Sequence, residues 1–165
     1  MQSDGELIER TLKGGDHYYG ILIQRYADYV FGLCMRLTGG NRASAEDISQ
    51  QSFLKSYKYL KAYDSKQDYK NWLTGITGNC FKDLRRQENR YESLDERAEP
   101  TFYPELHGNK DFFLLIKPLS AEEKILVVLK YLYDYQNADI GAFLGMKLGT
   151  VKSKLSRALD KLRWN

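Results

Sequence analysis

Apolar residues recur at helical spacing along most of the N-terminal half of the chain. One stripe, spaced 4, 3 and 4 residues apart, predicts a helix that begins near Asp16 and ends at Gly39; its members are Tyr26, Val30, Leu33 and Leu37. A second stripe, spaced 3, 4 and 4, predicts a helix from about Asp68 to Arg86; its members are Leu73, Ile76, Cys80 and Leu84. Between the two, Ser44 with Asp47 three residues later resembles a capping box and predicts a helix that runs to about Leu60.

The C-terminal part predicts a helix-turn-helix unit. Ser120 and Glu123 form a capping-box pattern at the start of a helix whose apolar positions are Ile125, Val128, Leu129 and Leu132. The chain turns at residues 135–137, and a short helix follows over Ala138–Leu144. A tight turn at residues 145–149 leads into a final helix from Thr150 to about Arg163. The short helix, the glycine in the turn and the apolar Val151 match the spacing of a helix-turn-helix motif.

The two helical parts are separated by a segment that does not favour one continuous helix. All three prolines fall between residues 100 and 118, and proline removes a backbone donor and restricts the residue before it. We predict a flexible linker at residues 91–118, with a short helical turn at Asp111–Ile116. The predicted fold class is therefore all-α, with two small helical domains at residues 1–90 and 119–165.

Composition narrows the class of protein. The chain of 165 residues has 28% charged residues and a net charge of only +3, so wholesale disorder is not expected. The polar, acidic N-terminus is not a signal peptide, and no apolar run reaches the about 18 residues of a membrane span, which favours a cytoplasmic protein. The two cysteines lie far apart, with no CxxC, so we expect two small buried apolar residues in a reducing compartment.

The sequence argues against an enzyme. His17 and His107 have no cluster of Cys or carboxylate residues at metal-ligand spacing, and neither GxxxxGK[ST] nor GxSxG occurs. Glu46 and Asp47 are adjacent on a predicted helix, so their carboxylates diverge rather than converge. We therefore expect no cofactor, no metal and no small-molecule substrate.

The final helix carries the clearest chemistry. Its predicted buried stripe is Val151, Leu155, Ala158 and Leu162. The opposite face and its rims carry polar and basic residues: Lys152, Ser153, Lys154, Ser156, Arg157, Asp160, Lys161 and Arg163. Small serines let a helix sit deep in the major groove while cations at its rims reach the phosphates. The alternative is a solvated basic face, but the tight glycine turn and the short preceding helix favour DNA binding. Lys154 stands where a further apolar residue is expected, and Leu155 takes that role.

Two blocks of the sequence resemble one known family. LSAEEKILVVLKYLYDYQNADIGAFLGMKLGTVKSKLSRALDKLR (119–163) resembles the region 4 helix-turn-helix of bacterial sigma factors, and residues 25–64 with NWLTGITGNCFKDLRR (71–86) resemble sigma region 2. Their order, with no middle domain, is similar to that of the extracytoplasmic-function (ECF) group. The resemblance implies a dissociable subunit that binds the clamp and flap of the RNA polymerase core, recognises the −35 and −10 promoter elements and promotes promoter melting for transcription initiation. It also implies an anti-sigma partner, which in this family is often anchored in the membrane.

The resemblance further implies three sets of contact residues. The polymerase core would be bound by Asp47, Gln50 and Phe53. The −10 element would be bound by the loop 65–69 and by Tyr63, Trp72, Ile76, Asn79, Lys82, Arg85 and Arg86. The −35 element would be bound by Thr150, Lys152, Ser153, Lys154, Ser156 and Arg157. An aromatic wall and an amide suit a base extruded from the stack. Core packing is the alternative role for Phe53 and for Trp72.

Two features of the sequence leave alternatives open. Gly75 and Gly78 lie inside a predicted helix, where each costs about 1 kcal/mol relative to alanine. Either a neighbouring helix approaches closely, or the glycines leave room for a ligand backbone in the −10 pocket. At the level of the whole protein, the rival to a sigma factor is a helix-turn-helix regulator that dimerises and binds DNA without polymerase.

Overall fold

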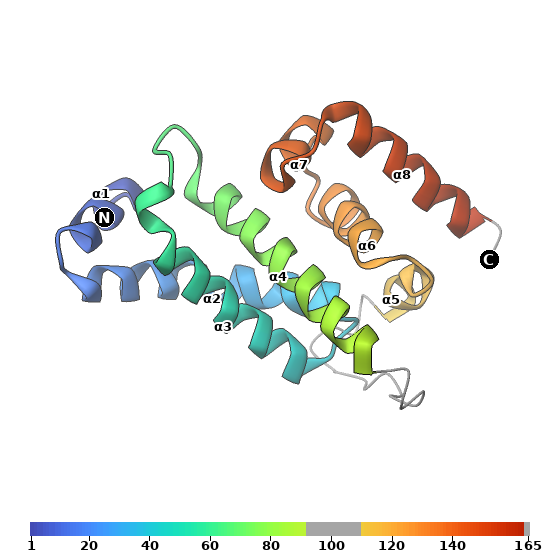
Figure 1. Ribbon diagram of the computed structural model, residues 1–165, viewed down its shortest axis with the longest axis horizontal. Helices are drawn as coiled ribbons and strands as arrows, with labels where there is room; N and C mark the ends of the chain where they lie inside the picture. The colour runs from blue at the N-terminus through green and yellow to red at the C-terminus, as the bar shows by residue number, and fades with distance from the viewer. Residues whose placement is uncertain (92–109, 164–165) are drawn as a thin grey trace.

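The computed structural model describes residues 1–91 and 110–163 and is helical throughout (Figure 1). The N-terminal part consists of α1 (Asp4–Leu12), α2 (Asp16–Leu37), α3 (Arg42–Lys58), a 3-10 turn (Leu60–Ala62) and α4 (Tyr69–Tyr91). The C-terminal part consists of α5 (Lys110–Ile116), α6 (Ala121–Val127), a π-helical turn (Val128–Leu132), α7 (Asn137–Leu144) and α8 (Leu148–Arg163). These two ranges contain no strand, so the all-α prediction is confirmed for them.

The first turn of α3 is capped by Asn41. Its side-chain oxygen accepts a hydrogen bond from the backbone N–H of Ser44 at 3.1 Å, so the helix begins at Arg42. Asparagine at this position satisfies one of the N–H groups that a helix start leaves without an intrahelical partner. The prediction of Ser44 as the N-cap is therefore wrong, and α3 also ends at Lys58 rather than at Leu60.

One helix was not predicted, and several helix boundaries differ from the predictions. Helix α1 was not expected, because its buried face consists only of Leu7, Ile8 and Thr11, which is too short for a periodic stripe. Helix α4 continues to Tyr91, five residues beyond Arg86. Helix α8 begins at Leu148, two residues before Thr150. The short helical turn expected at Asp111–Ile116 is present as α5, and residues 92–109 of the expected linker lie outside the described residues.

The capping box at the start of α6 is confirmed. The hydroxyl of Ser120 accepts a hydrogen bond from the backbone N–H of Glu123 at 3.2 Å, and the Glu123 carboxylate accepts one from the backbone N–H of Ser120 at 3.0 Å. Two N–H groups that the helix start would otherwise leave without a partner are thereby satisfied. The pair orients the Glu123 carboxylate at the point where α6 meets α8.

The N-terminal core lies between α2, α3 and α4, with α1 packed against α2. Its fully buried side chains include Leu33 of α2, Ile48 of α3, and Leu73 and Phe81 of α4. Both cysteines are buried, as expected, and burial raises the pKa of the Cys34 thiol to about 12. Such a thiol stays protonated near neutral pH and is a poor nucleophile.

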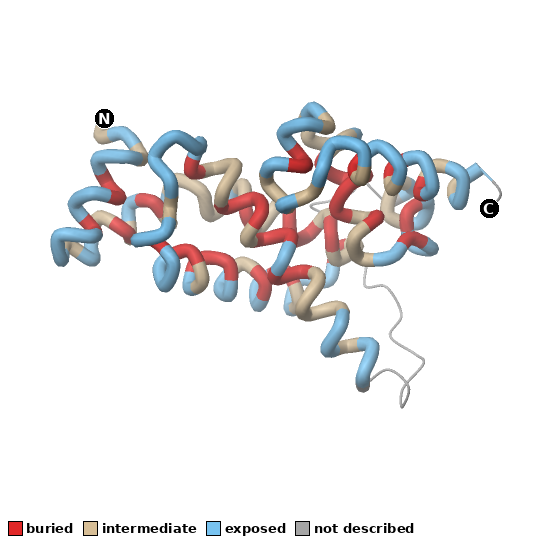
Figure 2. Tube along the Cα trace, turned by 45° about the horizontal axis from the view of Figure 1, so that its top comes forward, coloured by how far each residue is buried: buried red, intermediate tan, exposed pale blue. Residues whose placement is uncertain are grey.

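The same cluster of buried residues continues into α6, α7 and α8, where it includes Ile125, Leu126, Ile140, Val151 and Ala158. Helix α4 lies at the centre of this core, because it contacts α2 and α3 of the N-terminal part and α6 and α7 of the C-terminal part (Figure 1). Buried residues follow the inner sides of these helices, and exposed residues follow the outer side of α8 (Figure 2). Within residues 1–91 and 110–163, none of the helices combines the length and apolar content that a bilayer crossing requires.

Candidate nucleic-acid interface

Helix α8 divides into a buried face and an exposed face, as its sequence predicts. Val151, Leu155 and Ala158 are buried, and Leu162 is half-buried at the end of the stripe. The exposed face carries Lys152, Ser153, Ser156 and Arg157, and Thr150 is half-buried at its start. The Ser153 hydroxyl donates a hydrogen bond to the backbone oxygen of Thr150 at 3.1 Å. A short polar surface flanked by cations therefore points away from the protein.

The turn before α8 depends on two glycines. Gly145 ends α7 with a φ of +66°, in the left-handed region that favours glycine. At Gly141, a Cβ would lie 2.7 Å from the backbone oxygen of Met146 and 3.5 Å from Cγ2 of Val151. A side chain at position 141 would therefore push the turn and α8 away from α7. These glycines set the angle at which α8 is presented.

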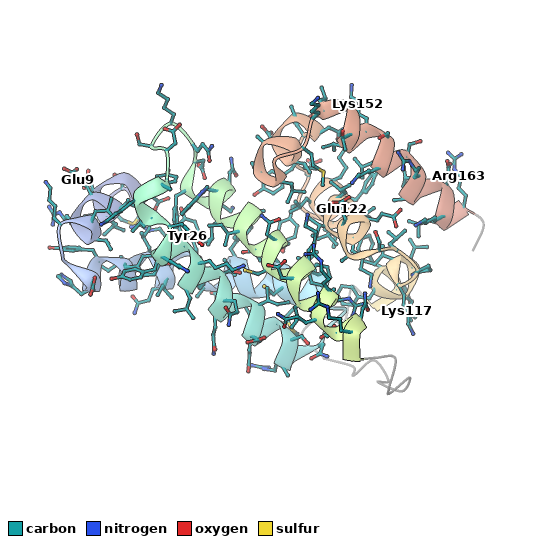
Figure 3. All side chains as sticks on the ribbon, in the orientation of Figure 1. Glu9, Tyr26, Lys117, Glu122, Lys152 and Arg163 are labelled. Carbon is teal, nitrogen blue, oxygen red and sulfur yellow. The ribbon has the colours of Figure 1, made fainter. Side chains whose placement is uncertain are left out.

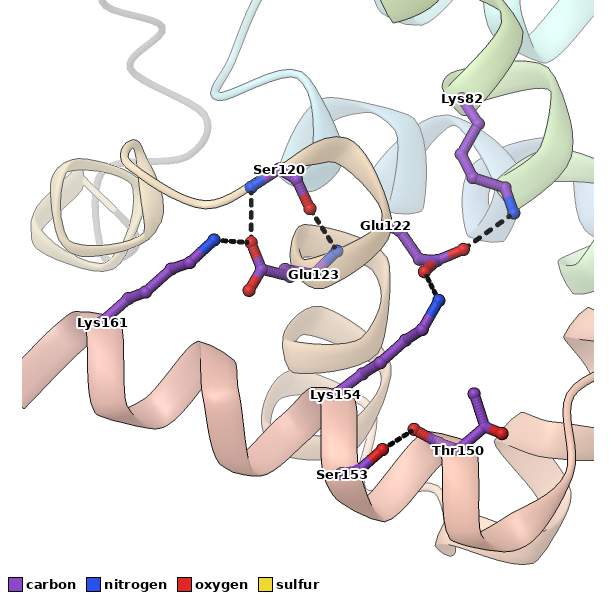
Figure 4. A network of polar contacts seen from close by, with 8 residues as sticks. All are labelled: Lys82, Ser120, Glu122, Glu123, Thr150, Ser153, Lys154 and Lys161. Atoms are coloured by element: carbon purple, nitrogen blue, oxygen red, sulfur yellow. Dashed lines mark hydrogen bonds and ion pairs between the residues drawn. The ribbon is translucent and has the colours of Figure 1, made fainter.

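Four of the five cations of α8 fall into two groups, and the fifth, Arg163, approaches Asp160 of the same helix at 4.0 Å. Lys152 and Arg157 are exposed and form no ion pair with any residue of the described ranges. Lys154 pairs with Glu122, and Lys161 pairs with Glu123 at 2.7 Å (Figure 4). Lys154 was predicted to contact DNA, but here it points back to α6. Figure 3 shows Lys152 and Arg163 on the outer side of α8, and Glu122 inside, between α8 and α4.

The two carboxylates of α6 are held in their charged form. Burial acts to raise the pKa of Glu122, but the hydrogen bond and charge of Lys154, together with Lys82, outweigh it, so the pKa lies below its usual range. Burial acts in the same way on Glu123, and Lys161 and the Ser120 groups outweigh it, so its pKa is also lowered. Both ion pairs are therefore intact near neutral pH.

Aromatic residues gather at the N-terminal end of α4. The Tyr63 ring lies 5.1 Å from the Trp72 ring and 5.9 Å from the Tyr69 ring, measured between centroids. Tyr69 is buried, whereas Tyr63 and Trp72 are half-buried. The Tyr63 hydroxyl donates to the backbone oxygen of Gln67 and so ties the ring to the loop at residues 65–69. Trp72 thus packs on this cluster and also presents part of its ring to solvent, where a base could stack.

The other residues predicted for the −10 element follow Trp72 along α4. Ile76 is half-buried and Asn79 is exposed, and their spacing places both on the same side of the helix as Trp72. Arg85 pairs with Glu88 at 3.2 Å and Arg86 approaches Asp83 at 3.9 Å, both within α4. Lys82 differs from them, because it pairs with Glu122 of α6 at 3.5 Å. The structure therefore brings together the aromatic cluster and Asn79, but directs Lys82 elsewhere.

The outer side of α3 carries the residues predicted to bind the polymerase core. Asp47 and Gln50 are exposed. Phe53 is buried, and its backbone oxygen accepts a hydrogen bond from the Tyr19 hydroxyl at 2.5 Å. Two large hydrophobic residues of α3 are exposed, and Leu54, with an exposed fraction of 63%, is more exposed than Tyr57 at 44%. Sequence reasoning missed Leu54, although it lies four residues after Gln50 and seven after Asp47, which is the spacing of a single helix face.

Sequence reasoning also missed Glu122 as the partner of two predicted DNA contacts. Glu122 stands in the first turn of α6, where an acidic residue suits the helix dipole, and nothing local indicated a second role. Among the described residues, no group of three or more His, Cys, Asp or Glu is placed to hold a metal ion.

Comparison with known proteins agrees with this architecture. The family described as "Sigma-70 region 2" matches residues 22–91, and "Sigma-70, region 4" matches residues 112–162. The ECF RNA polymerase sigma factor SigE of Mycolicibacterium smegmatis is 33% identical, with 86% of this chain aligned to 59% of that protein. SigW of Bacillus subtilis is 26% identical, over 94% of this chain and 92% of its own length.

Two solved structures share the fold. The sigma factor RpoE from Bartonella quintana, in complex with the anti-sigma factor NepR, has a TM-score of 0.70 at 22% identity, over 88% of this chain and 94% of that one. CnrH, in complex with the cytosolic domain of CnrY, has a TM-score of 0.67 at 20% identity, over 95% of this chain and 92% of that one. With both sigma-70 regions present in order, the chain belongs to the ECF group of RNA polymerase sigma factors. It spans about three-fifths of the length of the M. smegmatis relative.

Proposed function

We propose that this chain binds the RNA polymerase core and directs it to promoters, with α8 on the duplex of the −35 element and the aromatic end of α4 on bases of the melted −10 element. The exposed face of α8 carries the proposal. Its apolar side is buried against α6 and α7, while Lys152 and Arg157 are exposed and form no ion pair within the described residues. A helix packed in this way can enter a major groove without disturbing its own core.

The −10 contact follows from the aromatic cluster and Asn79. A base that leaves the stack needs an aromatic or apolar surface and a group that can both donate and accept hydrogen bonds. Trp72, Ile76 and Asn79 offer these on one side of α4. Capture of single-stranded bases would stabilise the melted promoter, while the polymerase makes the RNA. On this proposal the chain itself performs no chemistry and acts in the cytoplasm, with the polymerase.

The contact to the polymerase core is assigned to the outer side of α3. We place the apolar anchor at Leu54 instead of Phe53, because an exposed side chain can be buried by a partner whereas Phe53 already lies in the core. Asp47 and Gln50 flank it as polar contacts. The sigma factor RpoE of similar fold is bound to the anti-sigma factor NepR, and CnrH is bound to the cytosolic domain of CnrY. We propose an anti-sigma partner for this chain as well.

Run-off transcription with core polymerase tests the function directly. The chain should support a promoter-dependent transcript, and Lys152→Glu with Arg157→Glu should abolish promoter binding while core binding is retained. Loss of core binding in that variant would contradict the division of labour between α3 and α8. Co-purification with core polymerase separates this function from that of a helix-turn-helix regulator, which would dimerise and bind a palindrome without polymerase. If no candidate promoter gives a transcript, the proposed function is wrong.

A further inference from the structure

Helix α1 packs next to the residues proposed to bind the −10 element. This −10 surface consists of Tyr63, Trp72, Ile76 and Asn79. Helix α1 contacts α2 and also the 3-10 turn that ends at Tyr63 (Figure 1). The match to sigma-70 region 2 begins at residue 22, so α1 lies outside it. The family match therefore gives α1 no role in promoter binding, and any such role must be read from its contacts.

One carboxylate of α1 is held by two adjacent residues of α2. Oδ1 of Asp4 accepts a hydrogen bond from Nη1 of Arg25 at 2.6 Å, and Oδ2 accepts one from the hydroxyl of Tyr26. Hydrogen bonds to a charged acceptor are stronger than those between neutral groups. The first turn of α1 is fixed as well, because the Ser3 hydroxyl accepts a hydrogen bond from the backbone N–H of Glu6. Asp4 thus joins a fixed helix start to α2.

A chain of four rings leads from Tyr26 to the −10 surface. Measured between centroids, the Tyr26 ring lies 5.5 Å from the Tyr69 ring. The Tyr69 ring in turn lies 5.9 Å from the rings of both Tyr63 and Trp72. Tyr69 is buried, and its hydroxyl shares a hydrogen bond of 2.8 Å with the hydroxyl of Ser56. The buried Tyr69 ring therefore contacts both the ring that Asp4 holds and the two rings that a base could reach.

The charge of Asp4 does not explain its place beside a DNA surface. Burial raises the pKa of Tyr26, and the hydrogen bond and charge of Asp4 raise it further, so the hydroxyl stays a donor near neutral pH. Burial raises the pKa of Tyr63 as well, and the charges of Asp68 and Asp4 add to this effect. Negative charge this close to the −10 surface repels the phosphates of DNA. An acid at position 4 therefore requires a reason other than attraction of DNA.

We propose that Asp4 is a positioning residue of the −10 site, which holds Tyr26 and, through the chain of four rings, orders the aromatic surface that receives an unstacked base. The proposal rests on the proposed function and adds a residue from outside region 2 to the same site. Side chains that are already ordered lose less conformational freedom when a ligand binds, so an ordered cluster binds a base more tightly than a loose one. Release of the Tyr26 ring should weaken binding of single-stranded −10 DNA about fivefold.

Three variants of the full chain separate positioning from charge. Tyr26→Phe removes the hydrogen bond to Asp4 without a change of charge, whereas Asp4→Asn also removes the negative charge. Glu9→Gln is the matched control, because it removes a carboxylate from the same helix but breaks only the exposed pair with Lys13. Figure 3 shows Glu9 on α1 well apart from Tyr26. An effect of charge alone would make Asp4→Asn bind DNA more tightly than the wild type, and positioning predicts the opposite.

Two DNA probes measure the effect: a single-stranded −10 oligonucleotide and a −35 duplex. Each is titrated by fluorescence anisotropy at a temperature at which circular dichroism shows every variant to be folded. Tyr26→Phe and Asp4→Asn should bind the −10 oligonucleotide about fivefold more weakly than the wild type does. Both should bind the −35 duplex as the wild type does, because those contacts are proposed for α8. Glu9→Gln should match the wild type on both probes.

Trp72 reports on the order of the cluster without DNA. In a Trp164→Phe background it is the only tryptophan of the chain. Acrylamide should quench its fluorescence with a larger quenching constant in Tyr26→Phe and Asp4→Asn than in Glu9→Gln, because the rings around it are less tightly held. A role of Asp4 in stability alone would lower Tm but leave this constant unchanged at temperatures where the protein is folded.

The positioning role of Asp4 is overturned if Tyr26→Phe and Asp4→Asn bind the −10 oligonucleotide as the wild type does, which leaves the proposed function intact. It is also overturned if both probes are weakened equally, since α1 then only stabilises the fold. Weaker −10 binding with an unchanged quenching constant would overturn it too, because the cluster would then be undisturbed. If the wild type itself does not bind the −10 oligonucleotide, the proposed −10 contact fails, and the positioning role fails with it.

Discussion

The salt dependence of DNA binding can show which cations of α8 contact phosphates. Lys152 and Arg157 are exposed and form no ion pair with described residues, while the ammonium groups of Lys154 and Lys161 are held by carboxylates of α6. Each phosphate that a protein neutralises on duplex DNA contributes about 0.9 to the slope of log K against log salt concentration. Lys152→Gln and Arg157→Gln should therefore each make that slope shallower by about 0.9, and Lys161→Gln should leave it unchanged.

This difference is large enough to measure. Over a fourfold rise in salt concentration, the loss of one phosphate contact makes the decrease in affinity about threefold smaller. A fluorescence-anisotropy titration of a −35 duplex from 50 to 200 mM salt, about the range over which such slopes are measured, resolves a change of that size. Lys161→Gln should instead lower Tm, because it leaves the buried Glu123 carboxylate without its ion pair.

The outcome that refutes this reasoning is equally specific. Lys154→Gln or Lys161→Gln could change the slope as much as Lys152→Gln does. In that case the lysines break their ion pairs with the carboxylates of α6 when the protein binds DNA, and the orientation of side chains in the unbound protein does not predict the contacts. If Lys152→Gln and Arg157→Gln leave the slope unchanged, the exposed face of α8 does not bind DNA.

Three further outcomes follow from the structure. Asn79→Ala should impair promoter opening more than closed-complex binding, and normal opening in permanganate footprinting would exclude Asn79 from the −10 pocket. Ser120→Ala should lower the free energy of unfolding by about 1 kcal/mol in chemical denaturation, because the capping box is lost; a change of only a few tenths would contradict this role. Burial, together with the charges of Arg85 and Lys117, lowers the pKa of Lys124 from 10.5 to about 8. The charge of Lys124 therefore destabilises the folded state at neutral pH, and this destabilisation disappears as pH rises from 8 to 10.5. Lys124→Met should therefore raise Tm by about a few degrees at pH 7, and a difference from the wild type that persists above pH 10.5 would show that charge is not its cause.

Local patterns in the sequence were sufficient for the longer helices, though not for α1, and for the buried face of α8. The stripe of Val151, Leu155 and Ala158 follows from helical periodicity, and the Ser120–Glu123 box follows from a four-residue pattern. Each pattern lies within a few turns of one helix, so it can be recognised in the sequence without knowing which helices pack against it. The order of the two blocks that resemble sigma regions indicated the class of protein. The two blocks are independent of each other, so their occurrence in the expected order is stronger evidence than either block alone.

The direction of long polar side chains and the purpose of the inner glycines were decided only by the tertiary structure. Lys154 finds its partner Glu122 32 residues away in the chain, and Lys161 finds Glu123 38 residues away. Gly75 is explained only by the tertiary packing, because a Cβ at this position would lie 2.1 Å from the backbone oxygen of Phe143, which belongs to the other sigma region. Periodicity states which face of a helix is apolar but contains no information about which helix will cover it or which acid will lie opposite a lysine. For the same reason the sequence left Phe53 open between core and surface, and burial placed it in the core with Leu54 outside.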